Sequence, residues 1–456
     1  MQTAIVGAGP TGLFTAIALA RRGHRVTLVD RDPGPAPDGS WERRGVMQFH
    51  HPHGLRRQVV DCLTAEMPDV LGRPSARSGA VAGRLDGLLA AGAELAVLPA
   101  RDGRPAMVVG LHCRRMTFER VLRDAALAEP GVRLHSGHAD EVLSSGGRAS
   151  GLRVDGREIP FDLVINASGR AGRLAGDRRA PAIGGDCGLS YVSRQYALRP
   201  GAGWGPMNAP VGLIRTLGGY IIAVFLQDNR TYTTLIARPS DDRRLAGLRH
   251  TAAYEAATRA IPGMAEWVDD ERGTPITPVL PGGRLHNTYR GQAGADGRVP
   301  LPGLIHLGDA VCTTNPTAGR GIALGLRQSR RLVELLGDGS GDPAEVTAAF
   351  DAWCEINIKP WYDDHVYWDT DLLRRWAGGD VDLTRPLPSD LIIEAAQHDP
   401  SLMRVAGPFM AMDVPPSALA EIEPAARALY ASGWRPAPHP GPSRDELAGL
   451  VSGVLR

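Results

Sequence analysis

The fold is decided by Gly7-Ala8-Gly9-Pro10-Thr11-Gly12, which joins a short apolar run to a helical stretch of small residues. A second β-rich run begins at Arg25, and Asp30 closes it eighteen residues after Gly12. This order predicts a strand, a helix and a parallel strand. Gly7 permits the tight turn, Gly9 admits a pyrophosphate, Gly12 lets the helix pack on the sheet, and Asp30 can bind ribose hydroxyls. The stretch therefore predicts a dinucleotide site.

The composition is that of a globular protein that acts on small molecules. Of 456 residues, 43% are hydrophobic and 22% are charged, as in ordinary proteins with a sizeable core. Lys plus Arg (51) balance Asp plus Glu (50), so no net field gathers nucleic acid or an anionic membrane. Five scattered cysteines argue against a disulfide framework or a zinc site. Without room for a signal peptide or a long apolar run, we expect a cytoplasmic protein with no membrane span.

Two motifs in the last third of the chain point to the cofactor. The first is an apolar run that ends in Gly-Asp-Ala, Leu304-Ile305-His306-Leu307-Gly308-Asp309-Ala310. The second leads into a helical stretch and reads Asn315-Pro316-Thr317-Ala318-Gly319-Arg320-Gly321. Glycines at 319 and 321 would let backbone N–H groups reach a flavin, and the helix N-terminus would stabilise its negative charge. With these motifs the chain resembles the group A FAD-dependent monooxygenases of the p-hydroxybenzoate hydroxylase fold. The resemblance implies that Asp309 contacts the ribityl chain and that 316–321 follows the isoalloxazine ring.

The stretch 43–55 indicates which members of this family the chain resembles. Arg43-Arg44-Gly45-Val46-Met47-Gln48-Phe49-His50-His51-Pro52-His53-Gly54-Leu55 is similar to the Arg-x-Gly-Val-Pro-Gln-Gly-Arg-His-x-His-x-Leu stretch of bacterial polyether and squalene-type epoxidases. Met47, Phe49 and His50 depart from that pattern, so substrate contacts are not carried over. The resemblance implies that Arg43 lies along the FAD adenosine-pyrophosphate, which suits a planar guanidinium. Three close histidines could also suggest a metal, but no carboxylate or cysteine stands nearby at ligand spacing.

Two further segments bear on the cofactor and its reductant. Arg115 opens an Arg-x-x-Phe-x-x-x-Leu pattern that faces the FAD ribose and phosphates in the family, with a surface arginine as the alternative. Where one-component aromatic hydroxylases have an Asp-Gly pair linked to NAD(P)H handling, this chain reads Asn166-Ala167-Ser168-Gly169-Arg170. That version resembles the epoxidase-like and halogenase-like branches, although the halogenase Trp-x-Trp-x-Ile-Pro signature is absent. The electron source is therefore NAD(P)H or a separate flavin reductase.

The predicted site combines a cofactor part and a substrate part. The cofactor part comprises Gly7, Gly9, Pro10, Thr11, Gly12, Asp30, Arg31, Arg43, Gln48, Arg115, Ala139, Gly308, Asp309, Pro316, Gly319, Gly321 and Ile322. Candidate substrate-pocket residues are Tyr191, Arg194, Tyr220 and Phe225, with Trp361 and Tyr362 beside them. Most aromatic residues at such positions belong to the core. No metal and no catalytic triad is expected, because the flavin carries the chemistry.

The periodicity predicts an α/β fold. Its glutathione-reductase-type FAD-binding domain is Rossmann-like and discontinuous, with 1–75, 106–184 and 285–340. A substrate-binding domain with an inserted antiparallel β-sheet takes 76–105 and 185–284, and a C-terminal helical region takes 341–456. Strands are expected at 3–6, 25–29, 132–138, 151–154, 163–165, 189–196, 220–226, 231–236 and 304–307. Helices are expected at 12–22, 55–67, 117–127 and 322–336.

The activity implied by the resemblance is monooxygenation. Reduced FAD would react with O2 to a C4a-(hydro)peroxyflavin, whose distal oxygen hydroxylates or epoxidises a small organic substrate, such as a natural-product intermediate. An FAD-dependent dehydrogenase, oxidase or reductase acting on a carbon–carbon bond is an alternative, since saturating prenyl reductases share this fold. A flavin-binding protein without catalysis is the second alternative.

Overall fold

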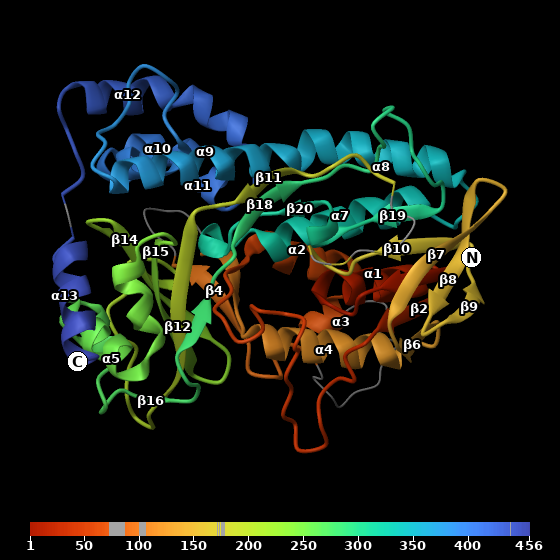
Figure 1. Ribbon diagram of the computed structural model, residues 1–456, viewed down its shortest axis with the longest axis horizontal. Coiled ribbons are helices and arrows are strands. Elements are labelled where there is room, and N and C mark those ends of the chain that lie inside the picture. Colours follow the sequence, from red (N-terminus) through yellow and green to blue (C-terminus); the bar gives the residue numbers. More distant parts are fainter. Residues whose placement is uncertain (73–86, 100–105, 171, 173, 175–177, 438) are drawn as a thin grey trace.

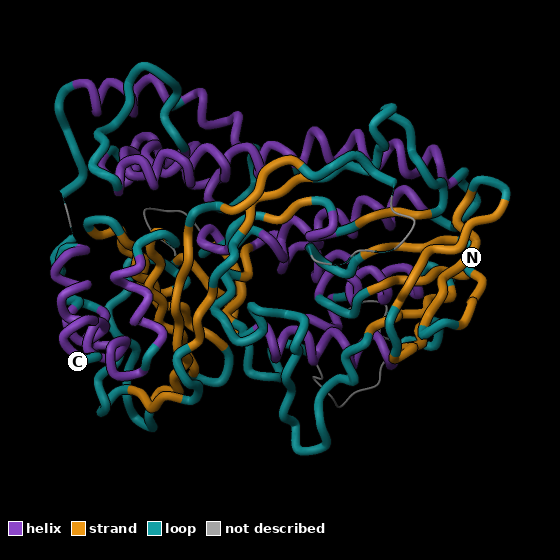
Figure 2. Tube along the Cα trace, in the orientation of Figure 1, coloured by secondary structure: helices purple, strands orange, loops and turns teal. Residues whose placement is uncertain are grey.

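The computed structural model describes residues 1–456 except 73–86, 100–105, 171, 173, 175–177 and 438. Figure 1 shows two neighbouring lobes, one around the N-terminal βαβ unit and the other around β12, β14 and β15. A layer of helices runs along one side of both lobes, and the tube in Figure 2 shows this layer continuing as α-helix over most of its length. The two lobes and the helical layer match the predicted fold class, in which an α/β FAD-binding part, an antiparallel β-sheet part and C-terminal helices are combined.

A parallel sheet forms the base of the first lobe. Among the described residues its strand order is β19-β10-β1-β2-β6, with every neighbouring pair parallel. The strands are β1 (Gln2–Val6), β2 (Arg25–Asp30), β6 (Val132–Ser136), β10 (Leu163–Asn166) and β19 (Leu304–His306). The strands β1, β10 and β19 are buried along almost their whole length because both faces of the sheet are covered there, whereas the edge strand β6 is partly exposed. The prediction of a Rossmann-like parallel sheet is confirmed.

Helices cover one face of this sheet and a small β-sheet covers the other. The helices are α1 (Pro10–Ala20), α4 (Arg115–Ala128) and α7 (Gly321–Leu336), whose apolar faces share one core with Ile5 and Ile165. The small antiparallel sheet consists of β7 (Ala139–Ser145), β8 (Arg148–Val154) and β9 (Arg157–Pro160). It packs against Ala4 and Val164 from the opposite side. The carboxyl ends of the parallel strands remain as the edge where the predicted cofactor residues gather.

The second lobe contains the predicted antiparallel sheet. Its strands run in the order β13-β14-β15-β12-β16, and β17 also pairs with β12. The bounds are β12 (Leu189–Leu198), β13 (Gly212–Leu217), β14 (Tyr220–Gln227), β15 (Thr231–Pro239), β16 (Gly273–Pro275) and β17 (Leu280–Gly282). One face, called the outer face here, is covered by η1 (Arg243–Arg249), α5 (Thr251–Ala260), α6 (Met264–Trp267) and α13 (Arg444–Val454). The opposite, inner face turns toward the first lobe.

Two short sheets connect the lobes and correct one predicted boundary. The first contains β3 (Leu55–Arg56), β4 (Glu94–Leu98) and β5 (Met107–His112). The helices α2 (Arg57–Glu66) and α3 (Pro68–Leu71) lie between β3 and β4 in the sequence. We assigned 76–105 to the substrate-binding sheet, but β4 pairs with β5 and not with that sheet, because Leu88 and Ala93 pack into the core of the first lobe. Residues 76–86 and 100–105 lie outside the described residues. The second short sheet contains β11 (Ile183–Asp186), β18 (His286–Tyr289) and β20 (Cys312–Thr313).

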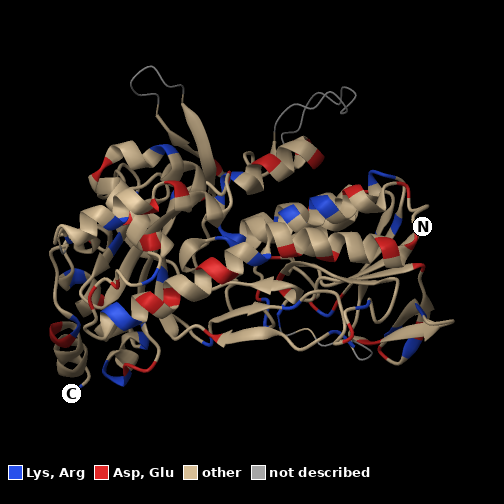
Figure 3. Ribbon diagram, turned by 90° about the horizontal axis from the view of Figure 1, so that it is seen from above, with Lys and Arg blue, Asp and Glu red and all other residues tan. Residues whose placement is uncertain are grey.

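The C-terminal region from residue 341 is helical, as predicted. The helices are α8 (Pro343–Asn357), α9 (Lys359–Trp376), α10 (Ser389–His398), α11 (Met403–Met410) and α12 (Glu423–Ala431). Their apolar residues extend the core of the first lobe, whereas α13 returns to the outer face of the second lobe. Figure 3 shows acidic and basic residues interspersed along these helices. Among the described residues, none of the helices combines the length and the apolar character that a bilayer crossing requires.

Candidate active site

The glycine-rich turn has the geometry that its sequence predicts. Gly7 has φ +105° and donates its N–H to Val29 O at 2.8 Å. A Cβ at Gly7 would lie 2.5 Å from Ala167 O, and a Cβ at Gly12 only 2.0 Å from Gly7 O. A Cβ at Gly9, by contrast, would meet no heavy atom of the described residues within 4 Å. Gly7 and Gly12 thus permit the turn itself, while Gly9 leaves the backbone open to a ligand.

A buried ion cluster stands behind this turn. Asp30 accepts a hydrogen bond from Ala8 N at 2.6 Å and from Arg43 Nη2 at 2.8 Å. Arg43 also binds Glu119 at 2.5 Å and the Ala8 carbonyl at 3.0 Å. Burial lowers the pKa of Arg43 and the three carboxylates around it raise it, with a net rise. The arginine that we expected along the FAD pyrophosphate is therefore mainly occupied by the protein, although its guanidinium touches the same turn.

Arg115 belongs to the same cluster and reaches toward the centre of the site. Its Nε donates to Glu119 Oε1 at 2.5 Å, across one turn of α4. Burial raises the pKa of Asp309 and of Tyr191, and the charge of Arg115 opposes both rises. Burial lowers the pKa of His53, and the charge of Arg115 lowers it further. These three residues come from three separate segments of the chain. The predicted alternative of a plain surface arginine does not fit a side chain that is 15% exposed.

The segment 315–321, called the flavin loop here, forms the second side of the site. Asn315 caps a single 3-10 turn, Pro316–Ala318, and Gly319 follows with φ +61°. Gly319 packs against the backbone of Gly54, since a Cβ there would lie 3.2 Å from Gly54 O. A Cβ at Gly321, where α7 begins, would meet no described atom within 4 Å. The loop therefore offers open backbone and a helix N-terminus on one side.

Asp309 lies between the glycine turn and the flavin loop. Its segment starts at Gly308, whose N–H donates to Gln328 of α7 at 2.9 Å and whose Cα lies against Thr11. The Asp309 side chain is accessible to water, yet the surrounding protein is dense enough to raise the pKa of its carboxyl, against the charges of Arg115 and Arg170. Asp309 is therefore an accessible carboxyl at the carboxyl end of β19, next to residues of α1 and α7.

The segment 48–54, called the bridging segment here, joins the flavin loop to the inner face of the antiparallel sheet. His51 Nδ1 lies 2.7 Å from Ser193 Oγ, and Gln195 Nε2 donates to His50 O at 2.5 Å. His51 also packs edge-on against Tyr191, with ring centroids 4.8 Å apart. At the other end, a Cβ on Gly54 would lie 3.8 Å from both Phe225 and Gly319.

Two of the three histidines of this segment, His51 and His53, are neutral at physiological pH. Burial, and then the charge of His50, lowers the pKa of His51 to about 4. Burial, and then the charge of Arg115, lowers the pKa of His53 to about 3. His53 Nδ1 lies 3.0 Å from His51 O, which can only accept, so Nδ1 carries the proton and Nε2 has the free lone pair. No three His, Cys, Asp or Glu side chains in the described ranges gather as a metal site requires.

The predicted pocket residues divide between the two faces of the sheet. Tyr191 and Phe225 lie on the inner face, beside His51 and Gly54. Arg194 lies on the outer face and binds Glu255 of α5 at 2.5 Å. Tyr220 also lies there, fully buried, with its hydroxyl on Pro442 O at 2.7 Å. The four side chains therefore do not line one pocket, because neighbouring residues of a strand point to opposite faces.

The remaining predicted residues lie at the margins of the site. Gln48 adjoins the Tyr191 hydroxyl. Burial raises the pKa of this hydroxyl, and the Gln48 side chain reduces the rise. Arg31 lies beside Gly45, Ala139 opens β7, and Pro10, Pro316 and Ile322 stand in the first turns of their helices. Trp361 and Tyr362 are core residues, since Trp361 stacks on Phe409 and Tyr362 packs against Tyr289.

The residues present fit an FAD molecule. Two glycines leave backbone uncovered where the family motif expects the pyrophosphate and the ring, and an accessible carboxylate and an arginine stand between them. Sequence reasoning missed Ser193, Gln195 and Glu119. The first two could have been found from the alternation along β12, in which polar Ser193 and Gln195 share a face with Tyr191.

Comparison with known proteins defines the family. The model for "FAD dependent oxidoreductase" matches residues 2–321, and the chain therefore belongs to the FAD-dependent oxidoreductase family. It is 26% identical to kynurenine 3-monooxygenase of Xanthomonas campestris pv. campestris (strain B100), over 76% of this chain and 74% of that protein. Zeaxanthin epoxidase of Oryza sativa subsp. japonica is 28% identical over 36% of this chain. D-amino acid dehydrogenase 2 of Ralstonia nicotianae is 47% identical over 51 residues. These last two matches span only 24% and 12% of the relatives' own lengths.

Solved structures show the same fold. The flavin-dependent brominase Bmp2 aligns with a TM-score of 0.59 and 14% identity, covering 95% of this chain and 100% of that one. The probable FAD-dependent monooxygenase pqsL from Pseudomonas aeruginosa has a TM-score of 0.55 and 15% identity, with 83% and 98% covered. Anhydrotetracycline hydroxylase OxyS from Streptomyces rimosus has a TM-score of 0.54 and 18% identity, and the alignment covers 90% of this chain and 76% of that one. The predicted fold, that of the p-hydroxybenzoate-hydroxylase-type flavin monooxygenases, is confirmed.

Proposed function

We propose that the protein is an FAD-dependent monooxygenase that transfers one oxygen atom of O2 to a small organic substrate, by hydroxylation or epoxidation. The observation that carries this proposal is the bridging segment, which joins the flavin loop to the inner face of the sheet through Gly54, His51 and Ser193. A sheet that roofs the ring side of the cofactor can enclose a substrate there and exclude water. The names of the monooxygenase and epoxidase relatives point the same way.

Bound FAD would supply the activation of O2, and the chain's own residues would bind, orient and shield. The open backbone at Gly9 and Gly321 and the side chains of Asp309 and Arg115 would bind the cofactor. We propose Tyr191 and Phe225 as the substrate-facing aromatic residues. His53 Nε2, an acceptor without charge, would orient a substrate hydroxyl or N–H group and would not alter the charge of the site between pH 5 and 9.

Isotope labelling tests this function. The FAD-loaded enzyme, with a reductant and a flavin reductase, is incubated under 18O2 with L-kynurenine and zeaxanthin as first probes and then with libraries of phenols and alkenes. We expect a product heavier by one oxygen that carries 18O from O2 and none from H2 18O. A product that has only gained or lost two hydrogens, with all O2 released as hydrogen peroxide, would instead support the dehydrogenase or oxidase alternative.

We further propose that a separate flavin reductase is the better electron source. Asn166 stands where one-component hydroxylases have the acidic residue of the Asp-Gly pair, and it is buried between His306 Nδ1 at 3.1 Å and Ser168 Oγ at 2.5 Å. In anaerobic stopped-flow measurements, NADPH alone should bleach the bound flavin too slowly to sustain turnover, while an added reductase restores it. Rapid bleaching by NADPH alone would rule out this electron route and leave the oxygen chemistry untouched.

A further inference from the structure

The C-terminal helices contact both ends of the flavin loop. At the first end, Asp369 of α9 accepts the side-chain N–H of Asn315 at 2.5 Å and that of Asn287 at 2.6 Å, both on Oδ2. Asn287 Oδ1 in turn accepts the backbone N–H of Asn315 at 2.7 Å. Asp369 is 3% exposed, so water does not compete for these bonds.

This contact orients the Asn315 side chain, and Asn315 shapes the loop. With its Nδ2 on Asp369, the amide oxygen of Asn315 faces the loop and accepts the backbone N–H of Thr317 at 2.7 Å. That bond caps the turn Pro316–Ala318, whose end places Gly319 in its left-handed conformation. A flipped or free Asn315 amide would present a donor to another donor and lose the cap.

At the second end, Arg320 connects the loop to the same helix. Its Nη1 donates to Asp364 Oδ2 at 2.6 Å, and its guanidinium lies over Trp361 at 4.8 Å and Phe409 at 5.2 Å. Arg320 is only 2% exposed. Between the two ends, Ala318 O accepts a hydrogen bond from Arg56 Nε at 2.9 Å. Residues of α9 and α11 and the Arg56 side chain thus contact the loop from Asn315 to Arg320, whereas Gly321 stays open.

We propose that Asp369 is a positioning residue for the cofactor, which acts through Asn315 to hold the flavin loop in its FAD-binding conformation. The family model ends at residue 321, so this role belongs to a part of the chain that the family model does not describe. The inference rests on the proposed FAD site and does not depend on which reaction the bound flavin performs.

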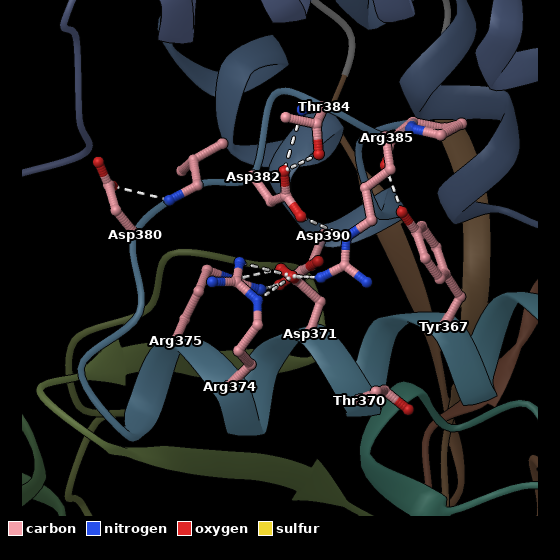
Figure 4. A network of polar contacts seen from close by, with 12 residues as sticks. Tyr367, Thr370, Asp371, Arg374, Arg375, Asp380, Asp382, Thr384, Arg385 and Asp390 are labelled. Carbon is pink, nitrogen blue, oxygen red and sulfur yellow. Dashed lines mark hydrogen bonds and ion pairs between the residues drawn. The ribbon is translucent and has the colours of Figure 1, made fainter.

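An ion network holds this half of α9 in place, as Figure 4 shows. Asp371 accepts Arg374 and Arg375 at 2.7 Å each and Arg385 at 3.1 Å. Arg375 also binds Asp390 of α10. The network fixes the rotation of α9 about its axis near the C-terminal end of the helix. In this orientation the side chain of Asp369 faces Asn315.

The charged and titratable groups around Asp369 come from several elements. Arg320 approaches from the flavin loop, Asp390 from α10 and the Cys187 thiol from the segment before β12. Burial, followed by the effect of Asp390, raises the pKa of Asp369 to about 6, against the hydrogen bonds from Asn287 and Asn315 and the charge of Arg320. As the pH falls through about 6, the carboxyl gains a proton and its bonds to the two amides become ordinary neutral ones, which are weaker.

The ionisation of Asp369 therefore has opposite effects on the stability of the apoprotein and on the affinity for FAD. Because the pKa of Asp369 is higher in the folded than in the unfolded chain, its ionisation makes the fold less stable as the pH rises between about 4 and 6. The same ionisation strengthens the hold on Asn315 and should tighten FAD binding. A residue with a purely structural role would move both quantities in the same direction.

The test measures FAD affinity of the full chain by flavin fluorescence quenching, from pH 5 to 8, together with the unfolding temperature of the apoprotein. For Asp369→Asn we expect FAD binding about tenfold weaker at pH 7.5, no loss of apoprotein stability, and a flattened pH dependence. Asp363→Asn is the matched control, since Asp363 lies on the same helix, is 52% exposed and binds only Lys359 among the described side chains.

A double-mutant cycle shows whether Asp369 acts through Asn315. Asn315→Ala alone should weaken FAD binding as much as Asn315→Ala with Asp369→Asn, because the second change then removes nothing further. Additive losses, or an FAD affinity of Asp369→Asn equal to that of the wild type, would overturn the proposal. If Asp369→Asn does not fold, the pH profile of FAD affinity in Asn315→Ala decides alone. A pH dependence of FAD affinity that survives in Asn315→Ala also overturns the proposal. No substrate is used, so the result is independent of the monooxygenase proposal.

Discussion

Replacing Gly9 by valine is expected to abolish FAD binding while the apoprotein stays folded. The Gly9 backbone has φ −83° and ψ −179°, an extended conformation that valine favours. A Cβ there meets no described protein atom within 4 Å. The branched side chain would fill the path of the pyrophosphate to the turn, so the affinity should fall by more than about 100-fold, or ~3 kcal/mol. Fluorescence titration with FAD and a thermal melt of the apoprotein check the two halves of this prediction.

Gly12→Ala is the matched control for this variant. Its Cβ would stand 2.0 Å from Gly7 O, so the helix cannot keep its position on the turn and the apoprotein itself should be less stable. A Gly9→Val protein that loses as much stability as Gly12→Ala would show that Gly9 is needed for packing. A Gly9→Val protein that binds FAD with wild-type affinity would place the pyrophosphate elsewhere.

The second large effect is expected for Arg43→Gln, which should lower the free energy of unfolding by about 3–5 kcal/mol. Arg43 is 7% exposed and binds Glu119, whose side chain is fully buried, together with Asp30. Without the guanidinium, Asp30 loses its ion pair, and Glu119 keeps only Arg115 to balance its buried charge. Urea unfolding of the apoprotein measures the loss. The deficit should shrink at acid pH, because the orphaned carboxylates can then bind protons.

Two variants separate the burial of Arg43 from the mere loss of a positive charge. Arg44→Gln changes an exposed neighbour and should cost little. Adding Glu119→Gln to Arg43→Gln removes one of the two buried negative charges that Arg43 had paired and should recover part of the loss. If Arg43→Gln costs no more than Arg44→Gln, the ion cluster does not stabilise the fold, and the arginine is better explained as a cofactor ligand alone.

The parallel sheet and the glycine turn could be predicted because the signals are local. The central strands β1 and β10 carry short apolar runs that are buried on both faces. Gly7 and Gly12 stand where a Cβ would collide with neighbouring backbone. Asp309 and the flavin loop follow from the same local logic. The partners of Arg43 could not be predicted, since Asp30 and Glu119 come from segments that meet only in the folded chain.

The two faces of the antiparallel sheet were harder to tell apart. Arg194 and Tyr191 are both plausible pocket residues by type, yet they point to opposite faces of β12. The outer face is covered by α5 and α6, which follow the strands, and by α13, which lies far along the chain. The role of Asp369 is equally hidden, because an acidic residue in an amphipathic helix is common and its partners, Asn287 of β18 and Asn315 of the flavin loop, lie far from it in the sequence.

The return of α13 to the second lobe has a consequence for the order in which the chain folds during synthesis. Leu447 and Val451 of that helix fill the same core as Leu245 and Leu248, next to the strands of the antiparallel sheet. The ribosome releases these strands long before α13, so their outer apolar face remains incompletely covered until the helix emerges. We therefore expect the first lobe to acquire its native structure first, and the second lobe to be the part of the nascent chain that relies on chaperones.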